Sequence, residues 1–227
     1  AGNVVGTVNL TGDSYLTAGS ITETSGGSGL IVFNKSNGVQ NYIFTGGSVS
    51  GVINFTVSNT TTLQMDSEGY LEGGGTCTLS AGATLGVTSA DGISTSGATG
   101  NVRTAGRVFL AGSNLIYNGN VNQVAGSGLA NTTKANVTIN NPGNTVTLSG
   151  NTTISAGLTV TAGSTLDLTS YTFSGPTSIA LGCGSTTATA ITGTGLITLA
   201  GPISTTDAGT GTNGATISAP IALAANR

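Results

Sequence analysis

Three acids that lie close together in the sequence are the residues with the widest range of possible chemistry. Asp66, Glu68 and Glu72 belong to the segment MDSEGYLEGGG. In an extended segment, alternation puts Asp66 and Glu68 on one face, with Glu72 beyond them. Carboxylates placed in this way can ligate calcium or form the acid and base pair of a glycosidase. The interpretation we favour is that they solubilise an exposed turn before the Gly run.

Two arginines extend this candidate site. Arg103 and Arg107 share strand parity in NVRTAGRVF. Together with the acids they could form a site like that of a polysaccharide lyase, many of which are β-helical. Such enzymes combine a calcium cage with a cationic base, whereas only 6% of this chain is charged. We therefore expect solvated arginines that flank a turn.

Other catalytic and metal sites are restricted by the absence of histidine from the 227 residues. Neither a Ser-His nor a Cys-His nucleophile can be assembled, and a zinc site is disfavoured. The two cysteines, Cys77 and Cys183, lie far apart in the sequence. We expect two separate buried thiols rather than a disulfide. No catalytic residue and no cofactor other than calcium is predicted, and we expect a protein that is not an enzyme.

The elements that position these residues come from a short internal repeat. The segment VNLTGDSYLTAGS at Val8 to Ser20 resembles VTLSGNTTISAGL at Val146 to Leu158. Further copies place Ala-Gly between two apolar-x-apolar pairs, as in CTLSAGATLGV from Cys77 and LTVTAGSTLDL from Leu158. The unit is an extended strand followed by a polar turn, which predicts an all-β protein built by repetition.

The repeat favours a parallel β-helix, a solenoid of roughly 20 residues per turn, about 11 turns and one domain over residues 1–227. The alternative is one or two β-sandwiches, which need no coil-length similarity. In the solenoid the first and third residues of each triplet face inward, and Thr78, Thr147, Thr159 and Thr198 face water. The inward residues are Val8, Leu10, Leu79, Leu85, Val87, Val146, Leu148, Leu158, Val160, Leu166 and Leu168. The two copies that begin at Val8 and Val146 should occupy equivalent sides of the stack, about seven turns apart.

Glycine and proline have expected places in this architecture. The 38 glycines suit corners that need positive φ. Pro142, Pro176, Pro202 and Pro220 should lie in turns or at strand starts, because proline cannot donate to a β-ladder.

One quarter of the chain resembles a known family. Asn114 to Leu168 contains the succession YNG, QVAGSGL, NVTINN, VTL and LTVTAGSTLDL. It is similar to β-helical segments of very large secreted surface proteins of Bacteroidota. The resemblance implies export, a cell-surface or extracellular location, and an adhesive or structural role.

Charge and chain ends complete the expectations. A net charge of −3 with five scattered basic residues gives no footprint for nucleic acid. No signal-like segment stands at Ala1 and no run of about 18 apolar residues occurs, so we expect no membrane span and, if the chain is exported, prior processing.

Neither end carries a charged or amphipathic cap. We therefore expect either a piece of a longer surface protein or a filament subunit that binds itself, with extracellular glycans or surfaces as other partners. A carbohydrate-binding or polysaccharide-degrading module is the alternative.

Overall fold

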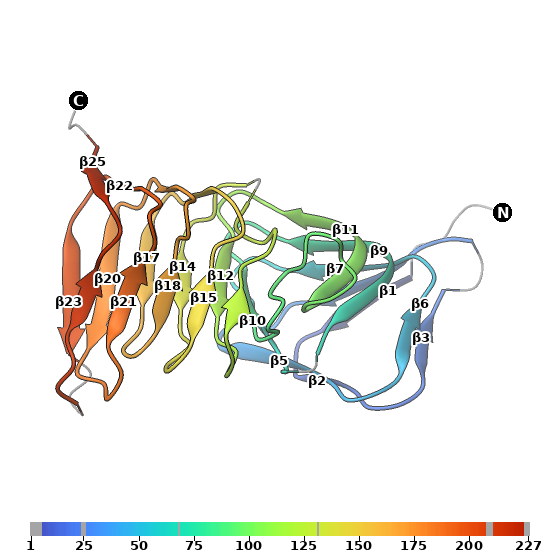
Figure 1. Ribbon diagram of the computed structural model, residues 1–227. Coiled ribbons are helices and arrows are strands. Elements are labelled where there is room, and N and C mark those ends of the chain that lie inside the picture. Colours follow the sequence, from blue (N-terminus) through green and yellow to red (C-terminus); the bar gives the residue numbers. More distant parts are fainter. Residues whose placement is uncertain (1–5, 24–25, 68, 131, 208–210, 225–227) are drawn as a thin grey trace.

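The chain folds as a β-solenoid whose coils stack along one axis (Figure 1). The computed structural model describes residues 6–23, 26–67, 69–130, 132–207 and 211–224. These residues contain strands and no α-helix. Every pairing between strands is parallel, which confirms the predicted parallel β-helix and rules out the β-sandwich alternative.

One nine-stranded sheet runs the whole length of the stack and gives each coil one strand. Residues that are register partners in this sheet form a column of inward-facing side chains along the axis. The column runs from Ser14 in the first strand to Thr205 in the last. In order along the axis, its strands are β2 (Ser14–Leu16), β5 (Val39–Phe44), β8 (Thr62–Met65), β10 (Thr84–Val87), β12 (Asn114–Tyr117), β14 (Val137–Ile139), β17 (Gly157–Val160), β20 (Ser178–Cys183) and β23 (Ile203–Asp207).

Two further faces close each coil. The preceding face comes before the nine-stranded sheet in chain order, and the following face comes after it. The preceding face contains β1 (Gly6–Leu10), β4 (Gly29–Phe33), β7 (Ile53–Val57), β9 (Leu71–Leu79) and β11 (Val102–Phe109), then β16 (Thr152–Thr153), β19 (Phe173–Ser174), β22 (Ile197–Leu199) and β25 (Ile221–Leu223). The following face contains β3 (Ser20–Thr22) and β6 (Ser48–Ser50), then β13 (Gln123–Val124), β15 (Thr145–Thr147), β18 (Thr165–Asp167), β21 (Thr189–Thr192) and β24 (Ala215–Ile217).

The coil length varies along the stack, and the stack has about nine turns of about 24 residues where about 11 turns of roughly 20 residues were expected. Val137 pairs with Leu158, whereas Thr84 pairs with Asn114, so the offset in sequence number is 21 (158 − 137) in one coil and 30 (114 − 84) in another. The two similar segments also lie on different faces, because β1 belongs to the preceding face and β15 to the following face. The prediction that they occupy equivalent sides was wrong.

A turn shared by other copies of the repeat shows how such an error arises. Ser80-Ala-Gly-Ala83 and Thr161-Ala-Gly-Ser164 both close with an N–H to C=O bond of 3.0 Å between their end residues. Their third residues, Gly82 and Gly163, have φ of 76° and 80°, as type II turns require. The first turn leads into the nine-stranded sheet, and the second leads out of it. The same local sequence therefore forms two different corners of the coil, and it does not determine which face the next strand belongs to.

The core confirms the predicted alternation with one exception. All the inward residues expected from Leu79 to Leu168 are buried, and Leu10 packs against the core. Val8 is 54% exposed because no described strand lies on the outer side of β1. The four outward threonines are half-buried by the coils above and below them. The four prolines lie in turns or just before strands, as expected.

Side-chain amides add hydrogen bonds between coils. Asn114 Oδ1 accepts bonds from both the backbone N–H and the Nδ2 of Asn136, at 3.1 and 3.0 Å. Asn136 Oδ1 in turn accepts the N–H of Gly157 at 3.0 Å. A polar side chain can thus pair with backbone that the strands leave unpaired at a corner.

Candidate functional site

The predicted acidic site is not assembled among the described residues. Asp66 Oδ1 accepts the N–H of Ser67 at 2.6 Å, so this carboxylate closes its own turn. Glu72 lies in β9, where its Oε1 accepts the N–H of Val49 at 3.0 Å. Glu68 lies outside the described residues. No group of three potential metal-ligating side chains was found in the part of the chain that the structure describes.

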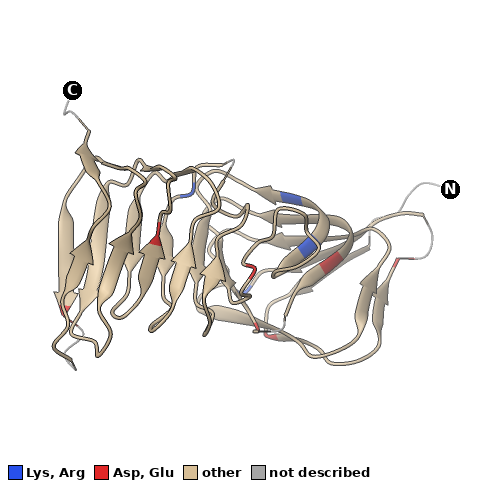
Figure 2. Ribbon diagram, in the orientation of Figure 1, with Lys and Arg blue, Asp and Glu red and all other residues tan. Residues whose placement is uncertain are grey.

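The two arginines contact a loop instead of the acids. Arg103 is the register partner of Glu72, but its guanidinium lies 3.7 Å from the centre of the Tyr70 ring and its Nε donates to Gly100 O at 3.0 Å. Arg107 donates to the carbonyls of Ser94 and Thr95. Both arginines therefore hold the segment 94–100, which belongs to the longest coil, against β11. Figure 2 shows that most charged residues of the described part of the chain lie in its N-terminal half.

The thiols are separate, as expected. Cys77 is buried in β9, and burial raises the pKa of its thiol to about 12. Cys183 is only half-buried, at the end of β20, which corrects the expectation that both would be covered.

A buried lysine went unnoticed in the sequence. Lys134 is 0% exposed, and its Nζ donates to Thr132 O at 3.0 Å and lies 5.7 Å from the centre of the Phe109 ring. Burial lowers the pKa of this amine to about 8. Among the described residues the single ion pair joins Lys35 to Asp13, so no carboxylate neutralises Lys134. The segment NTTKAN gives no apolar pattern that would have marked this lysine as internal.

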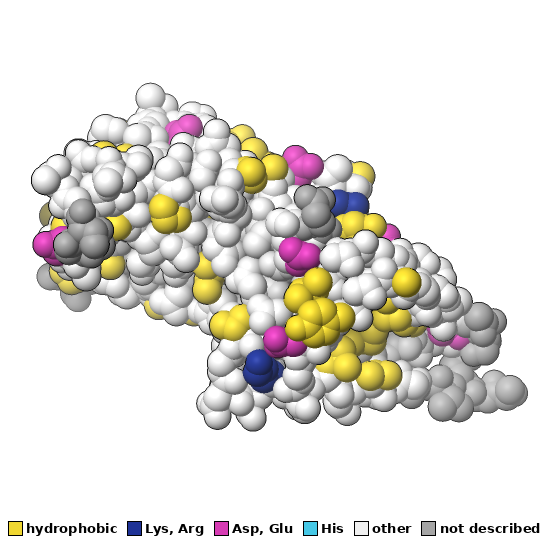
Figure 3. All heavy atoms as spheres, turned by 90° about the horizontal axis from the view of Figure 1, so that it is seen from below, with side chains coloured by type: hydrophobic (Ala, Val, Ile, Leu, Met, Phe, Trp, Pro, Cys, Tyr) yellow, Lys and Arg dark blue, Asp and Glu magenta, His cyan; other side chains and the backbone are white. Residues whose placement is uncertain are grey.

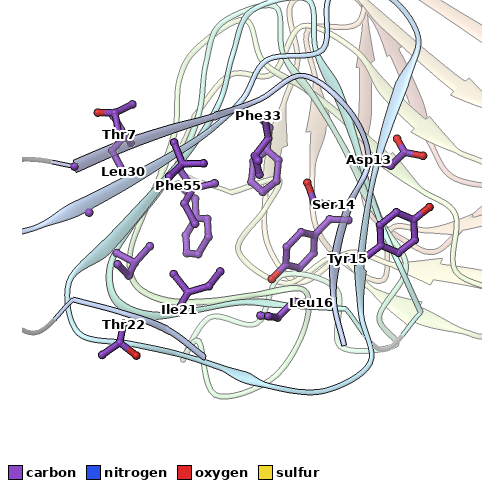
Figure 4. A pocket seen from close by; sticks show the side chains of 17 residues that line it. Thr7, Asp13, Ser14, Tyr15, Leu16, Ile21, Thr22, Leu30, Phe33 and Phe55 are labelled. Carbon is purple, nitrogen blue, oxygen red and sulfur yellow. The ribbon is translucent and has the colours of Figure 1, made fainter. Parts of the chain in front are cut away.

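A cavity of about 700 Å³ lies at the N-terminal end of the stack, and we call it the N-terminal mouth. Figure 4 shows Leu16, Ile21, Phe33 and Phe55 pointing into it, whereas Asp13 and Tyr15 point away. The first coil supplies one wall, and the second and third coils supply the floor. A pocket of this size and composition is typical of a binding site.

Two hydroxyls in the N-terminal mouth lack partners. Ser14 Oγ and Tyr42 Oη are covered from solvent, and no described residue makes a hydrogen bond to either oxygen. Burial also raises the pKa of Tyr42, so this phenol stays neutral. An unpaired buried hydroxyl costs free energy unless a partner arrives. Both side chains occupy inward positions of their strands, so strand parity was the signal in the sequence that could have located them.

Comparison with known proteins identifies no relative: no family model, no curated protein and no solved structure matches this chain. The resemblance of Asn114 to Leu168 to surface proteins of Bacteroidota therefore stays a prediction. No helix with the length and apolar character of a membrane span occurs among the described residues.

Proposed function

We propose that the chain is an extracellular structural and adhesive β-solenoid, either a section of a long surface protein or a subunit that assembles into a filament. The observation that carries this proposal is the unbroken nine-stranded sheet over a continuous core. Each rung adds about 4.8 Å to a rod held together by backbone bonds along its axis. Such a stack is suited to spanning distance.

The surface supports the same role. Outward positions carry mostly Thr, Ser and Asn, and Figure 3 shows one face that is largely uncharged, with apolar side chains gathered toward the N-terminal half. Asp66, Arg103 and Arg107 hold turns and loops, and Glu72 bonds the neighbouring strand β6. On this proposal the protein works by shape and display, without catalysis and without a cofactor.

Fractionation of the producing cells tests the location. Antibodies raised against the purified chain should detect it in the surface or medium fraction, and immunogold electron microscopy should place it on extended structures outside the cell. Detection in the cytosolic fraction alone would overturn the proposal.

A carbohydrate-binding role is the second candidate, and an exposed tyrosine favours it. Tyr15 is 64% exposed on the outer side of β2. Beside it, Asp13 accepts bonds from Asn41 N and Nδ2, both at 3.0 Å, and from Lys35 Nζ at 3.3 Å. An aromatic ring next to fixed polar groups is suited to a sugar ring. On a glycan array, Tyr15→Ala should lose binding that Tyr171→Ala retains; binding that both variants retain would exclude Tyr15.

A further inference from the structure

The preceding face of the stack is interrupted in its middle, between β11 and β16. β11 is the edge strand of the five-stranded sheet, and β16 begins the next sheet of that face. The coil between them crosses the face through residues 125–136, whose described members form isolated bridges at Gly126 and Lys134 and no strand. The β-ladder of this face therefore does not continue past β11, and the chain leaves a hollow beside that strand.

This hollow is a cavity of about 240 Å³, which we call the β11 pocket. Arg107 and Phe109 line it from β11, and Thr95 lines it from the loop before β11. Ser127 and Thr132 line it from the segment that lacks a strand. A cation, an aromatic ring and several hydroxyls from three segments meet in one concave site. Such convergence of polar groups is typical of a ligand pocket.

Arg107 is held in place and keeps donors for a ligand. Its two terminal nitrogens donate to the carbonyls of Ser94 and Thr95, the second bond at 2.8 Å. Gly97 packs closely on the guanidinium, since a Cβ added there would lie 3.3 Å from Arg107 Cζ. A guanidinium has five N–H donors, more than these two bonds use. A guanidinium oriented in this way is suited to a carboxylate, which it can bind through two parallel hydrogen bonds.

Lys134 adds a second positive charge beside the same ring. Its Nζ lies 5.7 Å from the centre of the Phe109 ring and donates to Thr132 O at 3.0 Å, and both of these residues line the β11 pocket. With its pKa lowered to about 8, the amine is still charged at pH 7. The one ion pair among the described residues joins Lys35 to Asp13, so neither cation of the pocket has a carboxylate partner there. A covered charge without a counter-charge is costly, and an anion in the pocket would offset that cost.

The surroundings favour a sugar acid over a simple anion. A second cavity of about 340 Å³ adjoins the β11 pocket at Thr95, which lines both. The polar side chains that line the second cavity besides Thr95 are those of Asp91, Ser94, Ser96, Thr99 and Ser149. Hydroxyls along two adjoining cavities can bond successive sugar rings, whereas a small inorganic anion would use Arg107 alone. Because Asp91 is acidic, the second cavity suits a neutral sugar.

We propose that the β11 pocket binds the carboxylate of an acidic sugar residue, with Arg107 as its ionic partner, and that the adjoining cavity holds a neutral sugar residue linked to it. Arg107 contacts the carboxylate, and Lys134 acts through its charge without touching the ligand. The inference rests on the proposed adhesive function and names its ligand class, a polysaccharide that contains uronate residues.

Calorimetric titration at pH 7 tests the ligand class. The probes are disaccharides that join glucuronate or galacturonate to galactose in either order, and the matched control is a disaccharide of galactose alone. At least one uronate disaccharide should bind about tenfold or more tightly than the neutral control. Sodium acetate and a hexaglutamate peptide should bind more weakly than that disaccharide. Equal binding of acetate, tighter binding of the peptide, or no binding of any uronate disaccharide would overturn the inference.

Matched arginine variants test the site. Arg107→Gln should weaken binding about tenfold to hundredfold, the loss expected for hydrogen bonds to a charged group. Arg103→Gln removes the same charge from the same strand and frees the same loop at Gly100 O, but Arg103 stacks on Tyr70 and does not line the pocket. It should bind like the unmodified chain. Equal losses in the two variants would assign the effect to net charge or to the loop and would count against the site.

A third variant tests the charge beside the ring in a chain whose fold is not weakened. Lys134→Met should weaken binding about tenfold, because an uncharged side chain no longer attracts the carboxylate through the low-dielectric interior. Lys35→Met removes an equal charge far from the pocket in sequence and should leave binding unchanged. Unchanged binding in Lys134→Met would remove this lysine from the site.

The proposed function and this inference fail separately. Uronate binding by a protein found in the cytosol alone would overturn the proposed function and leave the site standing. A protein found outside the cell that binds no uronate disaccharide would overturn the site and leave the proposed function standing.

Discussion

Replacement of Lys134 by methionine should stabilise the protein, and the gain should depend on pH. The amine is fully covered, its one hydrogen bond goes to Thr132 O, and the pKa of this lysine falls from 10.5 to about 8. At pH 7 the lysine is therefore charged in both the folded and the unfolded chain. Charge burial then costs about 3 kcal/mol, from about 1.36 kcal/mol for each pKa unit. Methionine has a similar length and no charge. Loss of the hydrogen bond to Thr132 O lowers the free energy of unfolding by about 1 kcal/mol. We expect a net gain of about 2 kcal/mol.

The sign of the pH dependence follows from the lowered pKa. Between pH 8 and 10.5 the unfolded chain holds a proton on Lys134 that the folded chain has lost. The free energy of unfolding of the unmodified protein therefore rises with pH through that window. Lys134→Met lacks this dependence, so its advantage should shrink across the same window and reverse before pH 10.5, where only the loss of the bond to Thr132 O remains.

Equilibrium urea unfolding followed by circular dichroism at pH 7, 8, 9 and 10 measures the difference. The matched control is Lys35→Met, which removes the same charge from a partly exposed side chain paired with Asp13 and should be no more stable than the unmodified chain. An advantage of Lys134→Met that stays constant over this pH range, or a variant less stable than the unmodified chain at pH 7, would refute the reasoning.

Three further predictions concern the core, the thiols and the first coil. Leu63→Ala, at a fully buried site of β8, should lower the free energy of unfolding by about 2–5 kcal/mol in urea titrations, whereas its outward neighbour Thr62→Ala should change it by less than about 1 kcal/mol. A thiol reagent should modify Cys183 in the native protein and Cys77 only after unfolding, because burial raises the pKa of Cys77 to about 12; modification of both native thiols at equal rates would contradict this. The hydrogen bonds from Asn41 and the Lys35 contact lower the pKa of Asp13 to about 2, so the stability they add is present above about pH 4 and is lost as pH falls toward 2; amide exchange in β2 and β5 should accelerate in that window, and not in Asp13→Asn.

Alternation made the fold predictable from the sequence. In the triplets of Val146, Leu158 and Leu166, the apolar residue faces inward and its threonine neighbours face outward, as the two-residue period requires. The face of the solenoid on which each strand lies was not predictable in the same way. A turn of the type Ala-Gly fits two corners, and the loop at 88–101 lengthens one coil without changing the strands around it.

The contacts of the candidate site depend on which coil lies next to which. Arg103 and Glu72 are register partners because the chain between β9 and β11 forms the longest coil of the stack. The same spacing places the Tyr70 ring against the guanidinium of Arg103. Lys134 is buried through contacts with other coils, including Phe109 on β11. Val8 satisfies the inward pattern and is still exposed, because β1 is the outermost strand of its face among the described residues. Local spacing cannot encode these relations.

The unequal coils have a mechanical consequence. Bonds between coils run along the axis, so a pull on the two ends of the chain loads one coil at a time and peels it from the stack. Each released coil lengthens the chain by its own contour, about 70 Å for the coil from Val137 to Leu158 and about 100 Å for the coil from Thr84 to Asn114. Extension would therefore proceed in steps whose sizes follow the order of the coils, and the rod would yield gradually under load.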